Sequence, residues 1–117
     1  MSTPTSRSLE FLRGQGYTAE VVERYNSFTR RRNDFLGFAD ILAFKIGVRG
    51  VLAVQTTSGS NASARIEKIR QEPKAGLWLA AGNQIVVHGW AKRGPRGKRK
   101  VWTCRETVFP TPEPSPE

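Results

Sequence analysis

Hydrophobic and polar positions along the chain predict short elements separated by glycine, proline and polar breaks. Leucine and phenylalanine side chains in segment 7–14 predict a short helix that nearby glycines end. Segment 17–25 is rich in residues that favour strands, and it predicts the first strand. Segments 37–45 and 51–57 are largely apolar and predict the second and third strands, with glycines in the turn between them.

A helical pattern follows the polar break at 58–61 and predicts a helix over about 62–71. The apolar run at 76–81 predicts a fourth strand. Segments 84–91 and 101–108 predict two further strands, with a basic loop between them. The order α-β-β-β-α-β-β-β predicts an α/β fold in which helices flank a mixed sheet.

The length suits one domain with one hydrophobic core, which we place at residues 7–109. We expect residues 1–6 to form a disordered leader and the proline-rich residues 110–117 to form a disordered tail. The start of the chain does not resemble a secretory signal, and no apolar run approaches the ~20 residues that span a bilayer. The single cysteine, Cys104, excludes an internal disulfide and a cysteine-cluster zinc site. We therefore expect a cytoplasmic protein with no membrane partner.

The chain carries 19 Lys and Arg against 10 Asp and Glu, and this net charge of +9 favours a polyanionic partner. The bases cluster in two predicted loops, 29–34 and 92–100. The candidate nucleic-acid-binding residues are Arg30, Arg31, Arg32, Lys92, Arg93, Arg96, Lys98, Arg99 and Lys100. Trp90 and Trp102 flank the second loop, and we expect at least one of them in the core. An exposed tryptophan there can stack on unpaired bases.

One polar residue interrupts each of two consecutive apolar strands. Asp40 lies in segment 37–45, and Gln55 lies in segment 51–57. A buried carboxylate is costly unless it is paired or holds a cation. Because a tight turn joins the two strands, we expect the two side chains to come within reach of one ion.

The sequences GFADILA (37–43) and VLAVQTTS (51–58) resemble two motif strands of the PD-(D/E)XK nuclease superfamily. The resemblance is closest to archaeal-type and phage Holliday junction resolvases and covers roughly the first two-thirds of the chain. It implies a restriction-endonuclease-like fold in which Asp40 is the metal-binding aspartate. The acid-x-lysine signature is degenerate, since Gln55 stands in place of the acid and Thr57 in place of the lysine.

The resemblance implies a Mg²⁺- or Mn²⁺-dependent endonuclease that hydrolyses phosphodiesters in branched or structured DNA. The candidate catalytic residues are Asp40, Gln55, Thr57 and Lys68, and the candidate metal ligands are Asp40, Gln55 and Glu23. Resolvases of this superfamily act as two-fold dimers, so the resemblance also implies a homodimer. A chain this small suits a phage or a microbial mobile element.

Several of these roles have alternatives. The base that replaces the signature lysine can be Lys45, Arg65 or Lys68, and the sequence does not choose among them. One of Glu20, Glu23 and Asp34 can complete the metal shell, although we expect Asp34 to pair with Arg31 or Arg32 of its own loop. Because both signature residues are replaced, the chain can instead be a catalytically inactive nucleic-acid-binding module on the same fold. A basic RNA-binding protein would fit the charge equally well but would leave Asp40 unexplained.

The lone histidine and the lone cysteine are weaker candidates. His88 shares one face of a predicted strand with Val86 and Trp90, which favours a packed or surface histidine over a general base. Cys104 has no histidine partner in a recognisable motif, so we do not expect a catalytic thiol.

Overall fold

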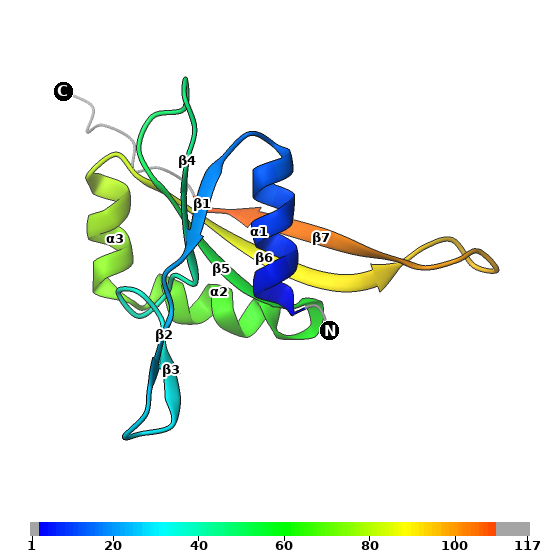
Figure 1. The fold of residues 1–117 in the computed structure, drawn as a ribbon, viewed down its shortest axis with the longest axis horizontal. Coiled ribbons are helices and arrows are strands. Elements are labelled where there is room, and N and C mark those ends of the chain that lie inside the picture. The colour runs from blue at the N-terminus through cyan, green and yellow to red at the C-terminus, as the bar shows by residue number, and fades with distance from the viewer. Residues whose placement is uncertain (1–2, 110–117) are drawn as a thin grey trace.

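The computed structural model describes residues 3–109, except for the side chain of Arg32. These residues form a mixed α/β fold with a five-stranded mixed sheet and three helices (Figure 1). The elements are α1 (Pro4–Gly14), β1 (Thr18–Val21), β2 (Arg24–Asn26), β3 (Arg31–Asn33), β4 (Ile41–Phe44), β5 (Leu52–Ser58), the 3-10 helix η1 (Gly59–Asn61), α2 (Ala62–Arg70), α3 (Pro73–Ala80), β6 (Gln84–Arg93) and β7 (Val101–Val108).

The sheet has the strand order β1-β4-β5-β6-β7. Strands β1, β4 and β5 form an antiparallel meander, and β7 is antiparallel to β6. Strand β6 pairs with β5 in parallel, from Leu52↔Gln84 to Ser58↔Trp90. A parallel pair needs a crossover connection, which η1, α2 and α3 supply here.

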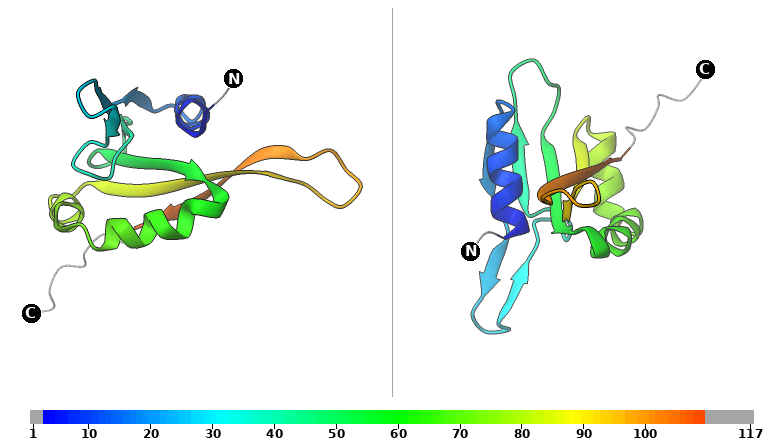
Figure 2. Two further views of the ribbon diagram at one scale, coloured as in Figure 1. Left: turned by 90° about the horizontal axis from the view of Figure 1, so that it is seen from below. Right: turned by 90° about the vertical axis from the view of Figure 1, so that its right-hand side faces the viewer.

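Helices cover both faces of the sheet: α1 lies on one side, and α2 and α3 lie on the other (Figure 2). Neighbouring residues of β5 point to opposite faces of the sheet and pack against different helices. Val54 belongs to a core cluster that includes Leu12 of α1, while Ala53 belongs to a second cluster with Ile69 of α2. Every residue of β5 except Ser58 is buried, as expected for a strand covered on both faces.

Two antiparallel hairpins project from this body (Figure 1). We call the β2–β3 hairpin, residues 24–33, the arm, and the outer part of the β6–β7 hairpin, residues 91–102, the ribbon. In the ribbon, strand pairing continues out to Arg93↔Val101. The predicted basic loop at 92–100 is therefore confirmed as a hairpin connection, although its first two residues still belong to β6.

The N-terminal helix begins earlier than expected, at Pro4 rather than residue 7. Thr3 is its N-cap: its hydroxyl accepts a hydrogen bond from the Ser6 N–H, and the Ser6 hydroxyl accepts one from the Thr3 N–H. Proline at the first helical position adds to this start signal. Residues 3–6 are therefore not a disordered leader. The expected tail at 110–117 lies outside the described residues.

The expected fourth strand at 76–81 is wrong, because this segment belongs to the helix α3. Glu72 caps that helix by accepting a hydrogen bond from the Lys74 N–H, and Pro73 occupies the first turn. The Trp78 indole then donates to the Gln84 carbonyl, which ties α3 to the start of β6. An apolar run without clear periodicity did not distinguish a strand from a helix.

Two further segments differ from the prediction. Segment 17–25 divides into β1 and the start of β2, and the expected loop at 29–34 contains β3. The second strand begins only at Ile41, because residues 35–39 form a tight turn closed by a Phe35↔Ala39 bridge. Within residues 3–109, no helix combines the length and the apolar character that a membrane crossing requires.

Candidate functional site

A pocket of about 740 Å³ opens where the arm joins the body. Its walls come from the start of α1, the base of the arm, the end of β5 and one side of α2. Strand register explains why polar residues meet here. Ile41 pairs with Val54, so Asp40 and Gln55, which flank that pair, lie side by side at the same end of the sheet.

Asp40 is only 3% exposed, and one of its oxygens is heavily hydrogen-bonded. Its Oδ2 accepts from the Gln55 Nε2 at 2.7 Å, the Thr56 N–H at 2.8 Å and the Thr56 hydroxyl at 3.1 Å. The Thr56 hydroxyl also lies 2.8 Å from the Thr5 hydroxyl of α1. This network fixes the carboxylate and joins it to the first helix. The expected proximity of Asp40 and Gln55 is confirmed.

Two more acids join Asp40. One carboxylate oxygen from each of Glu23, Asp34 and Asp40 lies within 4.8 Å of the others. Glu23 precedes β2 and Asp34 follows β3, and the pairing of Arg24 with Asn33 holds the two acids together at the base of the arm. A hexacoordinate Mg²⁺ with ligands at about 2.1 Å bridges oxygens up to about 4 Å apart, so small side-chain movements suffice to enclose an ion.

The acids perturb one another's protonation. Burial raises the pKa of Asp34 from 3.8 to about 6, and a hydrogen bond to Asp40 and repulsion from its charge add to this rise. Lys68 and Arg65 oppose it. Burial also raises the pKa of Asp40, and Glu23 adds to that rise, whereas hydrogen bonds from Asp34 and the Thr56 N–H lower it. A carboxyl pair that shares a proton would release that proton to solvent when a cation binds.

Gln55 and Thr57 occupy alternate positions of β5, and both line the pocket. Their side chains are 4% and 6% exposed. The Gln55 amide presents its NH₂ to Asp40, because a carboxylate oxygen accepts but does not donate. A rotation that exchanges the two ends of the amide would turn its carbonyl oxygen toward the acids. Gln55 can therefore serve as a neutral oxygen ligand, at the cost of its bond to Asp40.

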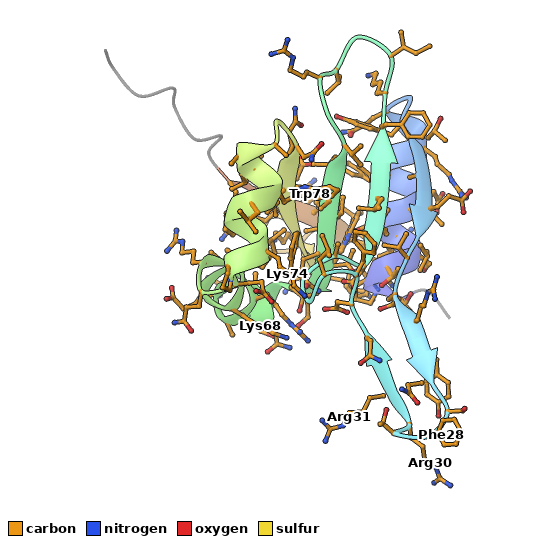
Figure 3. All side chains as sticks on the ribbon, turned by 90° about the vertical axis from the view of Figure 1, so that its left-hand side faces the viewer. Phe28, Arg30, Arg31, Lys68, Lys74 and Trp78 are labelled. Atoms are coloured by element: carbon orange, nitrogen blue, oxygen red, sulfur yellow. The ribbon has the colours of Figure 1, made fainter. Side chains whose placement is uncertain are left out.

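Among the three bases considered for the signature lysine, Arg65 and Lys68 line the pocket. They stand three residues apart on α2 and therefore share one face of the helix. Lys45 is engaged elsewhere: its Nζ donates to the Gln15 carbonyl at 2.7 Å and lies 5.6 Å from the Tyr17 ring centre. Figure 3 shows Lys68 on α2, near the end of the body from which the arm projects.

Sequence reasoning passed over Thr56 and did not link Asp34 to Asp40. The partner expected for Asp34 was an arginine of its own loop; its carboxyl group is hydrogen-bonded to Asp40, and the side chain of Arg32 lies outside the described part of the structure. The tight turn at residues 35–39 brings the two aspartates together, and Gly37 in that turn has a φ of 83°. In the sequence, the available signal for this turn was Gly37 together with the neighbouring Asp34. Glu20, by contrast, is exposed and lies 4.0 Å from Arg13.

The candidate nucleic-acid-binding residues lie on the two projections. Arg30 and Arg31 are at the end of the arm (Figure 3), and Arg32 is in β3. The others are Lys92 and Arg93 in β6 and Arg96, Lys98, Arg99 and Lys100 in the loop that follows.

The two tryptophans that flank the basic loop differ. Trp90 is 8% exposed and donates to the Ser8 hydroxyl, so one tryptophan lies in the core, as expected. Trp102 is 46% exposed, and the Arg7 guanidinium lies 3.6 Å from the centre of its ring. The indole ring is thus partly covered by a cation of α1.

The lone histidine and cysteine lie away from the pocket. His88 Nδ1 is 2.8 Å from the Ser8 hydroxyl, and its Nε2 is 3.2 Å from Glu106. Both His88 and Ser8 are completely buried, so this serine–histidine–glutamate chain cannot meet a substrate. Burial raises the pKa of Cys104 to about 12, which keeps its thiol protonated. A packed histidine and an inert cysteine agree with the interpretation of the sequence.

The pocket therefore offers oxygen ligands for a hard cation and two adjacent bases, and it lies at the base of the basic arm. No protein-family model, curated protein or solved structure matches this chain. Its function has to be inferred from the pocket and its surroundings.

Proposed function

We propose that this protein is a metal-dependent endonuclease of the PD-(D/E)XK type that cuts branched or otherwise structured DNA. The observation that carries the proposal is the convergence of Asp40, Glu23, Gln55 and Lys68 on one pocket, to which Asp34 adds a further carboxyl group. These residues come from four separate segments of the chain. Their assembly beside a strongly basic surface is hard to explain as a purely structural feature.

The order of elements supports a restriction-endonuclease-like core. Helix α1 is followed by the antiparallel strands β1, β4 and β5, then by α2, and then by β6 parallel to β5. The expected order holds through α2, with the arm inserted after β1; the helix α3 then stands where a strand at 76–81 was expected. Asp40 stands just before β4 and Gln55 within β5, on the neighbouring motif strands.

The donor set fits Mg²⁺ or Mn²⁺, because it consists of carboxylates and an amide with no sulfur or imidazole ligand. Asp40, Glu23 and Asp34 would hold the ion, with the Gln55 carbonyl as a neutral fourth ligand. When bound, such an ion activates water and neutralises developing charge on a phosphate. Asp40 is positioned for this role by Thr56, whose N–H and hydroxyl fix its Oδ2.

The remaining pocket residues would act on the substrate directly. Lys68 and Arg65 would bind the phosphate next to the cut and offset its charge in the transition state, which the signature lysine would otherwise do. Thr57 can donate a hydrogen bond to a phosphate oxygen but brings no charge. The arm and the ribbon would hold the flanking backbone by charge and shape. Paired cuts across a junction would require a two-fold dimer.

Cleavage of a labelled four-way junction in Mg²⁺ or Mn²⁺ tests the proposal. Asp40→Asn keeps a side chain of the same shape and an oxygen for the bonds from Thr56, but it removes the charge. We expect a loss of cleavage of at least about 100-fold, with DNA binding in EDTA unchanged. Glu20→Gln is the matched control, because Glu20 is an exposed acid on β1 outside the pocket.

A catalytically inactive nucleic-acid-binding module on the same fold is the second candidate, and one contact favours it. The Gln55 NH₂ occupies Asp40 Oδ2 at 2.7 Å, in the place where an active site would have a second carboxylate. If the protein binds the junction tightly but cuts it in neither metal, the nuclease proposal fails and this candidate stands. Competition among junction DNA, duplex DNA and RNA at one salt concentration would then identify the ligand.

A further inference from the structure

The arm carries an unusual arrangement of exposed aromatic side chains. Phe28 is 97% exposed at its end, and Tyr25 in β2 is 64% exposed. Figure 3 shows Phe28, Arg30 and Arg31 together at the end of the arm, well separated from the body of the protein. A phenylalanine with almost no packing contributes nothing to the core, so its place at this end requires another explanation.

The turn at the end of the arm is closed by hydrogen bonds to the Asn26 side chain. Asn26 and Arg31 form the last pair of the hairpin, and the Asn26 carboxamide oxygen accepts from the Phe28 N–H at 2.9 Å and the Thr29 N–H at 3.3 Å. Arg30 adopts a φ of 56°, a conformation for which glycine or asparagine is better suited. The turn thus presents Phe28 outward with an arginine two residues away.

The charge of the arm favours a nucleic acid over an apolar protein surface. Residues 24–33 include four arginines and no acid. Two exposed aromatic rings, Tyr25 and Phe28, amid four arginines are too few to form a hydrophobic protein interface, which needs a contiguous patch of several hundred Å². One ring does suffice to stack on one nucleobase while neighbouring arginines bind phosphates.

An unpaired base is the more accessible target. In an intact duplex both faces of a base are covered by its neighbours, and a ring can enter only after two base pairs have been unstacked. At a branch point, gap or single-stranded tail a base already offers a free face. Phe28 therefore suits DNA with unpaired bases, whereas the arginines suit any phosphate backbone.

The base of the arm lies in the pocket. Glu23 and Asp34 flank the two strands of the arm, and both belong to the acidic cluster. Asn26 lies three positions after Glu23, which at about 3.3 Å per residue places the turn roughly 10 Å beyond the acids. The two short strands of the arm thus connect its exposed end to two of the pocket acids.

We propose that the arm recognises unpaired bases in DNA: Phe28 stacks on an exposed base while Arg30 and Arg31 contact the adjoining phosphates. This inference rests on the proposed nucleic-acid-binding function but not on cleavage. In this proposal the arm selects the substrate, and the ribbon supplies affinity that does not depend on the structure of the DNA.

The test is binding in EDTA, so that no cutting occurs, to a gapped duplex and to an intact duplex of the same sequence. We expect Phe28→Ala to weaken binding to the gapped DNA by roughly 5- to 100-fold and to leave the intact duplex unchanged. Phe28→Trp should retain binding, because its ring also stacks. Ile46→Ala is the matched control, since Ile46 is 99% exposed in the loop between β4 and β5, away from the arm.

A 2-aminopurine placed in the gap gives a direct readout, because stacking by the wild-type protein should quench its fluorescence and Phe28→Ala should not. The inference is overturned if Phe28→Ala binds the gapped DNA like the wild type, or if it weakens both DNAs equally. It is also overturned if the variant changes only the oligomeric state in sedimentation, which would make the arm a dimer contact. A wild-type protein that binds selectively but never cuts would refute the nuclease and leave this inference intact.

Discussion

Replacing Asp34 with asparagine should make the ion-free protein more stable at neutral pH. In the wild type, Asp34 must ionise in a half-buried position beside Asp40, and its pKa rises from 3.8 to about 6. Asparagine has nearly the same shape and can donate a hydrogen bond to Asp40 without carrying a charge. The substitution therefore removes a repulsion that the folded state tolerates and the unfolded chain does not experience.

The size of the effect follows from the pKa shift. A rise from 3.8 to about 6 corresponds to about 3 kcal/mol of unfolding free energy as an upper bound. Because Asp34 is only half-buried, solvent screening reduces this, and we expect a gain of about 1–2 kcal/mol. For a domain of this size such a gain raises the Tm by roughly 5–10 °C.

The stabilisation expected for Asp34→Asn grows with pH. Below pH 3.8 the carboxyl group is protonated in both the folded and the unfolded protein, so the two proteins should differ little through this group. As the pH rises toward 6, the unfolded chain ionises first and the wild type loses stability. Above about pH 7 the loss is complete, and the gap between the variant and the wild type should be constant.

Urea unfolding in EDTA from pH 4.5 to pH 8, followed by tryptophan fluorescence, measures this gap. Glu20→Gln is the matched control, because Glu20 is an exposed acid outside the pocket. Added Mn²⁺ at 100 times its Kd should stabilise the wild type by about 2.7 kcal/mol and Asp34→Asn by less. The reasoning is refuted if Asp34→Asn gains nothing at pH 8 relative to pH 4.5.

Three further predictions concern other residues. Gln55→Glu restores a carboxylate to the signature position and should tighten Mn²⁺ binding about 10-fold by calorimetry; unchanged or weaker binding would remove Gln55 from the site. Lys68→Ala should slow junction cleavage at least about 10-fold, because Lys68 lines the pocket, whereas Lys45→Ala should leave the rate unchanged, because Lys45 lies elsewhere. Equal effects of the two substitutions would contradict a role for Lys68 at the cut. Burial lowers the pKa of His88, so its contribution to unfolding free energy should decline as the pH falls below 6.5; His88→Gln should lack this decline in urea titrations.

The parts of the fold that the sequence predicted well are those with strong local signals. Apolar segments bounded by glycine gave β4 and β5, and a polar break followed by helical spacing gave α2. The meeting of Asp40 with Gln55 was also predictable, because a tight turn between consecutive strands leaves few registers open.

The remaining errors have physical causes. The helix α3 was missed because its apolar residues cover several sides, although Glu72 and Pro73 are a helix start signal. The arm was missed because its strands are polar and pair only with each other. The link between Asp34 and Asp40 was missed because it is set by a turn at residues 35–39, whose hydrogen bonds from Phe35 and Ala39 cannot be inferred from composition.

The charge distribution couples the two proposed ligands. The chain carries a net charge of +9, yet three acids gather where the basic arm meets the body. With Gln55 in place of an acid, the pocket has less negative charge to hold a divalent ion alone, and a DNA phosphate bound by Lys68 and Arg65 would supply the missing charge. Metal and DNA should then strengthen each other's binding, and by linkage the two enhancement factors must be equal. Such reciprocity would be measurable even in a protein that never cuts its substrate.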